Sequence, residues 1–207
     1  MGYGAMLTLK DSIGGGFGKG PDGDVSDALI RLAGRITITD PEGTLQITTG
    51  AGGGNVSLGE LLIDAPNVIV NSSGNVQLYT SIDQLTLATT GAGDVSVREL
   101  GEITLADVRV LDGAFDITAG GSITAGKVVS ATDRSGNSIS MAAEGMGDIV
   151  VGVVQAGSAY GRIDLDAPLG RTVVPNGQFR ARLHDHFGSG LHVNLIQGRG
   201  FVVGTGI

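Results

Sequence analysis

The chain has 207 residues, with 37 glycines, five Phe, three Tyr and no Trp. It has no cysteine, which excludes disulfides and thiol chemistry. The glycines do not follow a Gly-X-Y triplet, which excludes a collagen helix. A hydrophobic content of 41% argues against disorder, and no apolar run approaches the roughly 18 residues of a membrane-spanning helix. The net charge of −8 disfavours nucleic acids and anionic membranes as partners, because both are negatively charged.

Residues 1–33 precede the regular part of the sequence and are rich in glycine. Within this segment and just beyond it, "DVSDALIRLAG" (24–34) is the single stretch whose apolar spacing suits a short helix. The start of the chain lacks the order of basic, apolar and small residues found in a secretory signal peptide. We therefore treat residues 1–33 as a unit distinct from the regular part of the chain.

A short pattern of a glycine, a polar residue and alternating apolar residues recurs between residues 34 and 170. Its seven occurrences begin at Gly34 (GRITI), Gly54 (GNVSL), Gly74 (GNVQL), Gly93 (GDVSV), Gly113 (GAFDI), Gly136 (GNSIS) and Gly161 (GRIDL). The first five lie 19 or 20 residues apart, and the longer later intervals predict insertions in one loop of a coil. Such a period indicates stacked structural repeats.

Apolar residues alternate within each repeat, which is the period of a strand with one buried face. The pairs are Ile36/Ile38, Val56/Leu58, Val76/Leu78, Val95/Val97, Phe115/Ile117 and Ile163/Leu165, with Ile139/Met141 displaced by one residue at Gly136. A second alternating run follows about ten residues later. It comprises Leu45/Ile47, Val68/Val70, Leu85/Leu87, Ile103/Leu105 and Ile149/Val151.

Short strands that repeat in this way cannot each close a separate core, whereas stacked coils bury like positions in ladders. The sequence therefore predicts an all-β parallel β-solenoid over residues 34–170, with coils of about 20 residues stacked about 4.8 Å apart. Val56, Val76, Val95 and Phe115 should form one buried column. Glycine, Asn and Asp at the corners should supply positive φ angles. An antiparallel β-sandwich is the alternative, because it also has regularly spaced short strands.

Residues 171–207 lack the repeat and contain all three histidines and four arginines. The last coil of a solenoid leaves backbone groups unpaired, so an atypical terminal segment is expected there. We predict a C-terminal β-hairpin-like cap over residues 171–207.

Two stretches, "GAGDVSVRELGEITLADVRVLDGAFDITAGGSITAG" (91–126) and "GDIVVGVVQAGSAYGRIDLDAP" (147–168), resemble the repeat regions of filamentous-haemagglutinin-like large exoproteins. "DSIGGGFGKGPDGDVSDALIRL" (11–32) is similar to the segment in which a turn of these proteins leads into a chain-crossing loop, so the resemblance implies a first coil, a crossing loop and a cap in residues 1–33. It covers residues 7–168 and implies a bacterial surface adhesin. The family's Asn-Pro-Asn-Gly motifs are absent, which predicts an internal or C-terminal part of a longer protein.

His184, His186 and His192, in "RLHDHFGSGLH", are the candidate metal ligands. A His-x-His pair on a strand places both imidazoles on one face, a spacing that zinc sites use. No fourth ligand is evident, and Asp185 would point to the other face. A polar hairpin with a glycine turn is the alternative interpretation.

Three aspartates, Asp22, Asp24 and Asp27, and separately Asp164 and Asp166, are candidate calcium ligands, with surface or capping roles as the alternative. "GKGPDG" (18–23) matches the glycine pattern of dinucleotide sites, but no βαβ frame follows it. A phosphate loop would need Ser or Thr after Lys19, and glycine stands there. We expect no cofactor.

Asp116, Asp164 and Asp166, with Arg162, are the candidates for a carbohydrate-cleaving site, since such enzymes need carboxylates and often a basic residue on one face. The sequence does not repeat them into an evident cluster, and aromatic residues for a sugar platform are few. An ice-binding face would need Thr-x-Thr on every coil, and only Thr37 and Thr39 satisfy this.

These features predict a non-catalytic, structural fragment of a large secreted or surface-anchored bacterial adhesin. Its partners would be host or neighbouring-cell surface glycans or proteins and the adjacent repeats of the parent chain. The longer loops between Gly113 and Gly161 are the expected contact sites. The alternative is a polysaccharide lyase or hydrolase, or a carbohydrate-binding module, on the same scaffold.

Overall fold

The computed structural model describes residues 34–50, 54–132, 134, 136–157 and 161–174, together with the backbone of five short outlying strands. The outlying strands are β1 (Met6–Lys10), β2 (Leu29–Arg31), β15 (Gln178–Phe179), β16 (Val193–Ile196) and β17 (Phe201–Val203). No helix occurs among the described residues, so none there could span a membrane.

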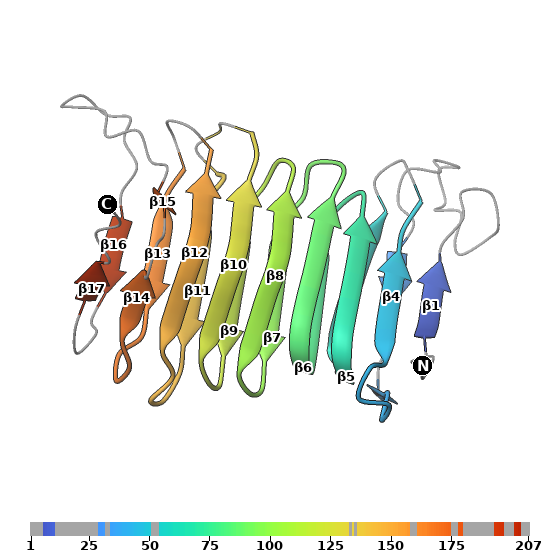
Figure 1. Ribbon diagram of the computed structural model, residues 1–207. Coiled ribbons are helices and arrows are strands. Elements are labelled where there is room, and N and C mark those ends of the chain that lie inside the picture. The colour runs from blue at the N-terminus through green and yellow to red at the C-terminus, as the bar shows by residue number, and fades with distance from the viewer. Residues whose placement is uncertain are drawn as a thin grey trace.

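The strands stack as parallel coils in one continuous sheet (Figure 1). In chain order, the central strands are β3 (Gly34–Thr37), β4 (Thr44–Thr48), β5 (Asn55–Ser72), β6 (Val76–Thr89), β7 (Val95–Glu99), β8 (Ile103–Val110), β9 (Phe115–Ala119), β10 (Ile123–Ser130), β11 (Ile139–Ala143), β12 (Ile149–Ala156), β13 (Ile163–Asp166) and β14 (Thr172–Val174). Each pairs in parallel with the equivalent strand of the next coil, for example β7 with β9 and β8 with β10. The fold is therefore a parallel β-solenoid, and the antiparallel sandwich is excluded.

Each central coil has two faces joined at two edges. Face A consists of β7, β9, β11, β13 and the first parts of β5 and β6, and face B consists of β8, β10, β12 and the last parts of β5 and β6. The lower edge in Figure 1, where face A leads into face B, contains residues 100–102, 120–122, 144–148 and 167–171. The upper edge, where face B leads into the next coil, contains residues 90–94, 111–114, 131, 132, 134, 136–138, 157, 161 and 162.

The predicted buried column on face A is confirmed. Val56 pairs with Val76, Val76 with Val95 and Val95 with Phe115, and all four side chains are 1% exposed. Ile139 and Ile163 continue the column, so the one-residue displacement expected at Gly136 is also correct. With strands about 4.8 Å apart, the five steps from Val56 to Ile163 span about 24 Å.

Face B carries the second predicted run with one adjustment. Leu45, Val68, Leu85 and Leu105 align in one column. The register then shifts after Leu85, where β8 contains an extra residue. Before the bulge, Ile103 pairs with Ile123 and Ile123 pairs with Ile149, so these three residues form a separate column. The extra residue adds to the outward side of face B, because Ala106 and Asp107 both lie between the buried residues Leu105 and Val108.

Two ladders of interactions hold the upper edge together and explain the recurring glycine–polar pattern. The side-chain oxygen of each polar residue accepts the backbone N–H of its counterpart in the next coil: Asn55 from Asn75 (2.7 Å), Asn75 from Asp94 (2.8 Å) and Asp94 from Ala114 (2.8 Å). The preceding glycines stack so closely that a Cβ on Gly93 would lie 2.5 Å from the carbonyl carbon of Gly74. The pattern recurs because each coil must rest directly on the one before.

The positive φ angles expected at these corners are found only in part. Among the described glycines, Gly34, Gly113, Gly145 and Gly157 have positive φ, whereas Gly93 does not. At Gly93 the requirement for glycine comes from the close approach of the neighbouring coil, because a Cβ would also lie 2.6 Å from the nitrogen of Asn75. The expectation was therefore wrong for Gly93, where packing between coils imposes the residue.

Two expectations concern the ends of the solenoid. The short helix proposed over residues 24–34 does not form at Leu29–Arg31, which is strand β2, where Ile30 pairs in parallel with Val56. Residues 24–28 lie outside the described residues. Most of residues 171–207, where a C-terminal cap was expected, also lie outside the described residues, so the cap stays a prediction. The strands that are described in this segment, β14 to β17, pair in parallel with β12, β13 and β14.

Candidate functional site

The structure brings the three candidate carbohydrate-site aspartates onto the outward side of face A. Asp116 pairs with Ser140, and Ser140 pairs with Asp164, so one coil separates the two aspartates. Asp166 lies two residues beyond Asp164 in β13 and aligns with Ala142. Two coil steps of about 4.8 Å place the Cα atoms of Asp116 and Asp164 about 10 Å apart.

The charged residues on the outward side of face A have different environments. Burial raises the pKa of Asp116 above 3.8. The Nε of Arg162 lies 2.7 Å from an oxygen of Asp164, so this predicted basic residue forms an ion pair with its acidic neighbour. The guanidinium of Arg98 lies 5.5 Å from the ring centre of Tyr79, also on face A. Face A can therefore offer carboxylates, an arginine and an aromatic ring to a ligand that lies along the coils.

The remaining predicted ligands cannot be placed. His184, His186 and His192 lie outside the described residues, as do Asp22, Asp24, Asp27 and the glycine pattern at 18–23. These assignments stay predictions. Within the described ranges, no three His, Cys, Asp or Glu side chains are grouped so that they could hold a metal ion.

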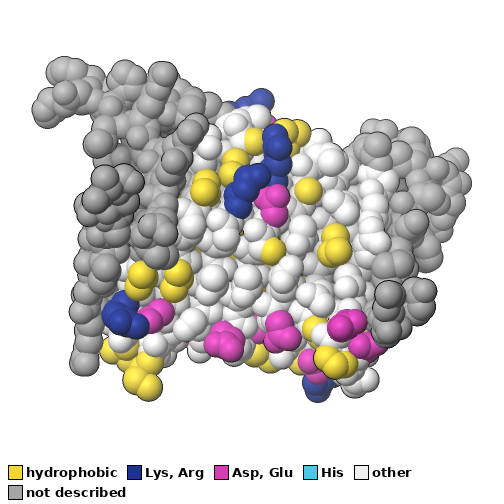
Figure 2. Space-filling view, viewed as in Figure 1, with side chains coloured by type: hydrophobic (Ala, Val, Ile, Leu, Met, Phe, Trp, Pro, Cys, Tyr) yellow, Lys and Arg dark blue, Asp and Glu magenta, His cyan; other side chains and the backbone are white. Residues whose placement is uncertain are grey.

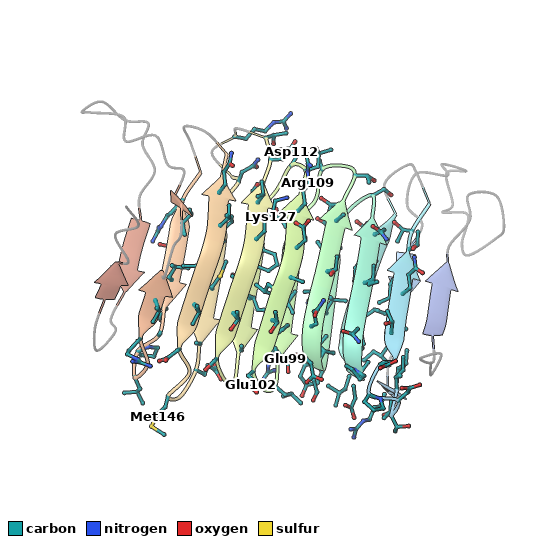
Figure 3. All side chains as sticks on the ribbon, in the orientation of Figure 1. Glu99, Glu102, Arg109, Asp112, Lys127 and Met146 are labelled. Atoms are coloured by element: carbon teal, nitrogen blue, oxygen red, sulfur yellow. The ribbon has the colours of Figure 1, made fainter. Side chains whose placement is uncertain are left out.

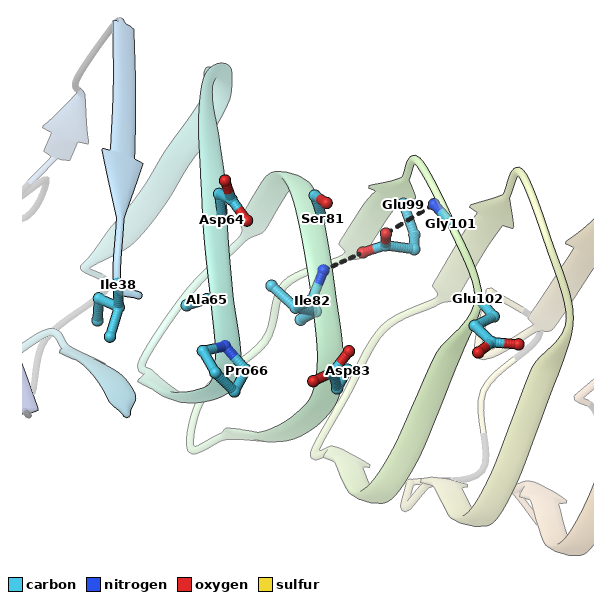
Figure 4. A pocket seen from close by; sticks show the side chains of 10 residues that line it. All are labelled: Ile38, Asp64, Ala65, Pro66, Ser81, Ile82, Asp83, Glu99, Gly101 and Glu102. Carbon is cyan, nitrogen blue, oxygen red and sulfur yellow. Dashed lines mark hydrogen bonds between the residues drawn. The ribbon is translucent and has the colours of Figure 1, made fainter. Parts of the chain in front are cut away.

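A pocket of about 330 Å³ lies at the lower edge, and the sequence pattern did not identify it (Figure 4). Four carboxyl-bearing residues line it, namely Asp64, Asp83, Glu99 and Glu102, and Ile82 contributes an apolar surface. Figure 2 shows several acidic side chains along this edge, and Figure 3 places Glu99 and Glu102 there. The pocket therefore has an acidic lining contributed by several successive coils.

Glu99 is the buried member of this group. It ends β7 at a position where strand alternation turns the side chain inward, and it is 3% exposed. In the register of face A, Thr80 occupies this position in the preceding coil and Ala119 in the following one. Glu99 thus places a carboxyl group in the core, where its neighbours carry a hydroxyl and a methyl group.

Hydrogen bonds from two coils surround the Glu99 carboxylate. One oxygen accepts the Thr80 hydroxyl at 2.8 Å and the Ile82 N–H at 3.1 Å, and the other accepts the Gly101 N–H at 2.8 Å. Burial raises the pKa of Glu99 above 4.5, and the hydrogen bonds from Gly101, Thr80, Ile82 and Leu100 oppose that increase without cancelling it.

A change in coil geometry explains why a carboxylate is needed here. Strand β6 continues through the lower edge without a break, whereas the next coil ends β7 at Glu99 and begins β8 at Ile103. Leu85 follows Leu78 by seven residues, but Leu105 follows the equivalent Val97 by eight. At this junction the oxygens of Glu99 accept backbone N–H groups, a task that carbonyl oxygens perform along the regular ladder.

Ion pairs lie at the upper edge and on face B instead. Arg134 lies 2.9 Å from Asp112, and Lys127 lies 3.6 Å from Asp107 (Figure 3 labels Lys127 and Asp112). The pair between Lys127 and Asp107 is exposed on both sides and contributes little to stability, whereas the Asp112 side chain is only 13% exposed. This edge includes part of the longer loops that the sequence marked as contact sites, and the lower edge supplies another part, where Met146 is 85% exposed.

Comparison with known proteins identifies no relative. No family model matches the chain, no curated protein matches it, and no solved structure matches it. The β-solenoid fold and its two candidate surfaces, face A and the acidic pocket, are therefore the basis for a functional proposal.

Proposed function

We propose that the chain is a rigid, non-catalytic segment of a bacterial adhesin that is secreted or anchored at the cell surface. The observation that supports this proposal is the uninterrupted buried column from Val56 to Ile163, because it ties successive coils into one body. The resemblance of the repeats to large exoproteins supports the same function. In this role the solenoid acts mechanically, holding contact surfaces away from the cell.

The contact surfaces in this proposal are the outward side of face A and the longer loops. On face A, polar residues follow one another along the coils in the order Ser57, Gln77, Ser96, Asp116, Ser140 and Asp164. Hydroxyl, amide and carboxylate groups repeated about every 4.8 Å can form hydrogen bonds to an extended glycan or to a protein strand. Host or neighbouring-cell glycans and proteins are the proposed partners, and further repeats of a parent chain would extend the rod.

An adhesion assay tests this proposal. Beads coated with the purified chain should attach to epithelial or bacterial cells, and the soluble chain should compete for the attachment. Beads coated with a Val76→Asp variant, whose buried column is expected to fail, provide the unfolded control. Absence of attachment to every cell type and to a glycan array would contradict the adhesin proposal.

A second candidate function, carbohydrate cleavage or binding on face A, rests on the placement of Asp116 and Asp164. Inverting glycosidases keep their two carboxyl groups about 6.5–9.5 Å apart, and one of them must be protonated. The raised pKa of Asp116 suits the acid, and Asp164 would be the base. Release of reducing sugars or unsaturated products from a polysaccharide panel, abolished by Asp116→Asn and retained by Ser96→Ala, would favour this function over the adhesin.

A further inference from the structure

Glu99 differs from every other charged residue that the structure describes, because it alone is buried. Its carboxyl group lies at the junction between the continuous coil of β6 and the divided coil of β7 and β8. The proposed adhesin function does not use this group. Its hydrogen-bond partners and neighbouring charges indicate a role of its own.

The ionised form of Glu99 is fully hydrogen-bonded. Thr80 Oγ1, Ile82 N and Gly101 N all donate to it within 3.1 Å. Each carboxylate oxygen thus has at least one donor, although burial still disfavours the charge.

The neutral form can be hydrogen-bonded as well, because a threonine hydroxyl can reverse its direction. Thr80 Oγ1 also lies 3.4 Å from the carbonyl oxygen of Arg98. If the Glu99 oxygen nearest Thr80 carries a proton, that O–H can donate to Thr80, while the Thr80 hydroxyl donates to the Arg98 carbonyl. The Ile82 and Gly101 N–H groups keep their acceptors in both states.

The other charged residues that line the pocket beside Glu99 are all acidic. Asp64 from β5, Asp83 from β6 and Glu102 from the lower edge line the same pocket. Arg35 of β3 forms its ion pair with Asp64, and the Arg98 guanidinium lies over Tyr79 on the outward side. The face A position of the next coil is Ala119, which carries no charge. No cation therefore contacts the Glu99 carboxylate among the described residues.

We propose that Glu99 and Thr80 form a buried proton-binding site at the junction of the two coil types, which makes the solenoid more resistant to unfolding in weakly acidic solution than in neutral solution. The direction follows from proton linkage. Because the pKa of Glu99 is higher in the folded chain than the ordinary value of 4.5, the folded state binds the proton more tightly than the unfolded state. The resulting stabilisation is complete below the unfolded pKa and is lost as the pH rises through the folded pKa.

The titration of Glu99 can be measured directly in the full chain. The sequence contains five glutamates, so ¹³C-labelled glutamate gives five carboxyl signals that backbone-directed NMR can assign without any variant. The Glu99 signal should show its inflection above pH 4.5. An inflection at or below 4.5 would overturn the proposal, and this measurement decides it even if substituted chains fail to fold.

Urea unfolding across the same pH range tests the effect on stability. The quantity to follow is the folding equilibrium constant of the wild type divided by that of Glu99→Ala. This ratio should fall by up to tenfold for each pH unit as the pH rises through the titration of Glu99. Glu144→Ala is the matched control, because Glu144 is exposed and follows Ala143, the counterpart of Glu99 two coils later. Parallel pH profiles for the wild type and Glu99→Ala would overturn the proposal.

The role of Thr80 has its own test. Thr80→Val removes the hydroxyl from both protonation states, so it should lower the urea midpoint at about pH 5 as well as at about pH 7. Thr80→Ser keeps the hydroxyl and should preserve the wild-type pH profile. If Thr80→Val lowers the urea midpoint only at neutral pH, the Thr80 hydroxyl does not accept a hydrogen bond from protonated Glu99. That result would refute the proposal that Thr80 is hydrogen-bonded to Glu99 in both protonation states.

Discussion

Substitution of Gly93 by alanine should destabilise the solenoid through contact between coils. The added Cβ would lie 2.5 Å from the carbonyl carbon of Gly74 and 2.6 Å from the nitrogen of Asn75. Ordinary van der Waals contacts lie at 3.4–4 Å, so the two coils must separate locally by about 1 Å. Both groups are backbone, and neither can move away by changing a rotamer.

The cost can be worked out from the bonds at this corner. Overpacking of a tightly packed site costs about 1–3 kcal/mol. Separation also lengthens the hydrogen bonds that join these two coils, such as Val76 N–H to the Asp94 carbonyl oxygen (2.9 Å) and Asp94 N–H to Asn75 Oδ1 (2.8 Å). Each contributes about 1 kcal/mol, while the lower entropy of the unfolded alanine chain offsets about 0.4–1 kcal/mol. The expected net loss is about 2–4 kcal/mol, or a decrease in Tm of about 5–15 °C for a chain of this size.

Gly136→Ala is the matched control, because no atom lies within 4 Å of the Cβ that it would add. Its stability should stay unchanged or rise by about 0.4–1 kcal/mol. Thermal and urea unfolding, followed by far-ultraviolet circular dichroism, give both values. Equal stabilities for the two variants would refute the explanation that coil contact imposes glycine at position 93.

Two further predictions concern the buried column and a surface ion pair. Val76→Asp should cost several kcal/mol and lower Tm strongly, because it leaves an unpaired carboxylate in the buried column. Gln77→Asp, on the exposed side of the same strand, should leave Tm almost unchanged. Equal Tm values for the two variants would contradict the assignment of buried and exposed faces. The hydrogen bond from Arg171 lowers the pKa of Asp148 below 3.8, so the stabilisation is present above 3.8 and is lost as the pH falls through the lower folded value. Arg171→Gln should return the Asp148 titration, measured by NMR, toward 3.8, and an unchanged titration would refute the pairing.

The sequence was sufficient to predict the coils because their determinants repeat locally. Alternation indicated the buried residues, and the constant phase of the glycine pattern indicated their alignment, which the pairing of Val76 with Val95 confirms. The first repeat is the exception, because Ile36 pairs with Ile63 and not with Val56. Even the displacement to Ile139 could be inferred, because an inserted residue moves the whole apolar pattern with it.

The acidic pocket could not be predicted in the same way. Strand alternation after Val95 and Val97 does point Glu99 inward, and this charged residue at an apolar position was the available signal. The hydrogen bonds of Glu99 depend on how many residues the two neighbouring coils have at the lower edge. A difference in that number decides which backbone N–H groups lack a carbonyl partner. The reason for glycine at position 93 is likewise set by atoms about 20 residues away.

The parallel register also determines how the chain can fold. In the face A column each residue pairs with one that lies 19 to 24 positions further along the chain, from Val56 to Val76 and onward to Ile163. No strand of this column pairs with a distant part of the sequence. The exposed edge of a folded coil can therefore act as a template on which the next residues of the chain form their strands. Folding can therefore advance in one direction, a coil at a time, as the chain emerges from a ribosome or a narrow channel.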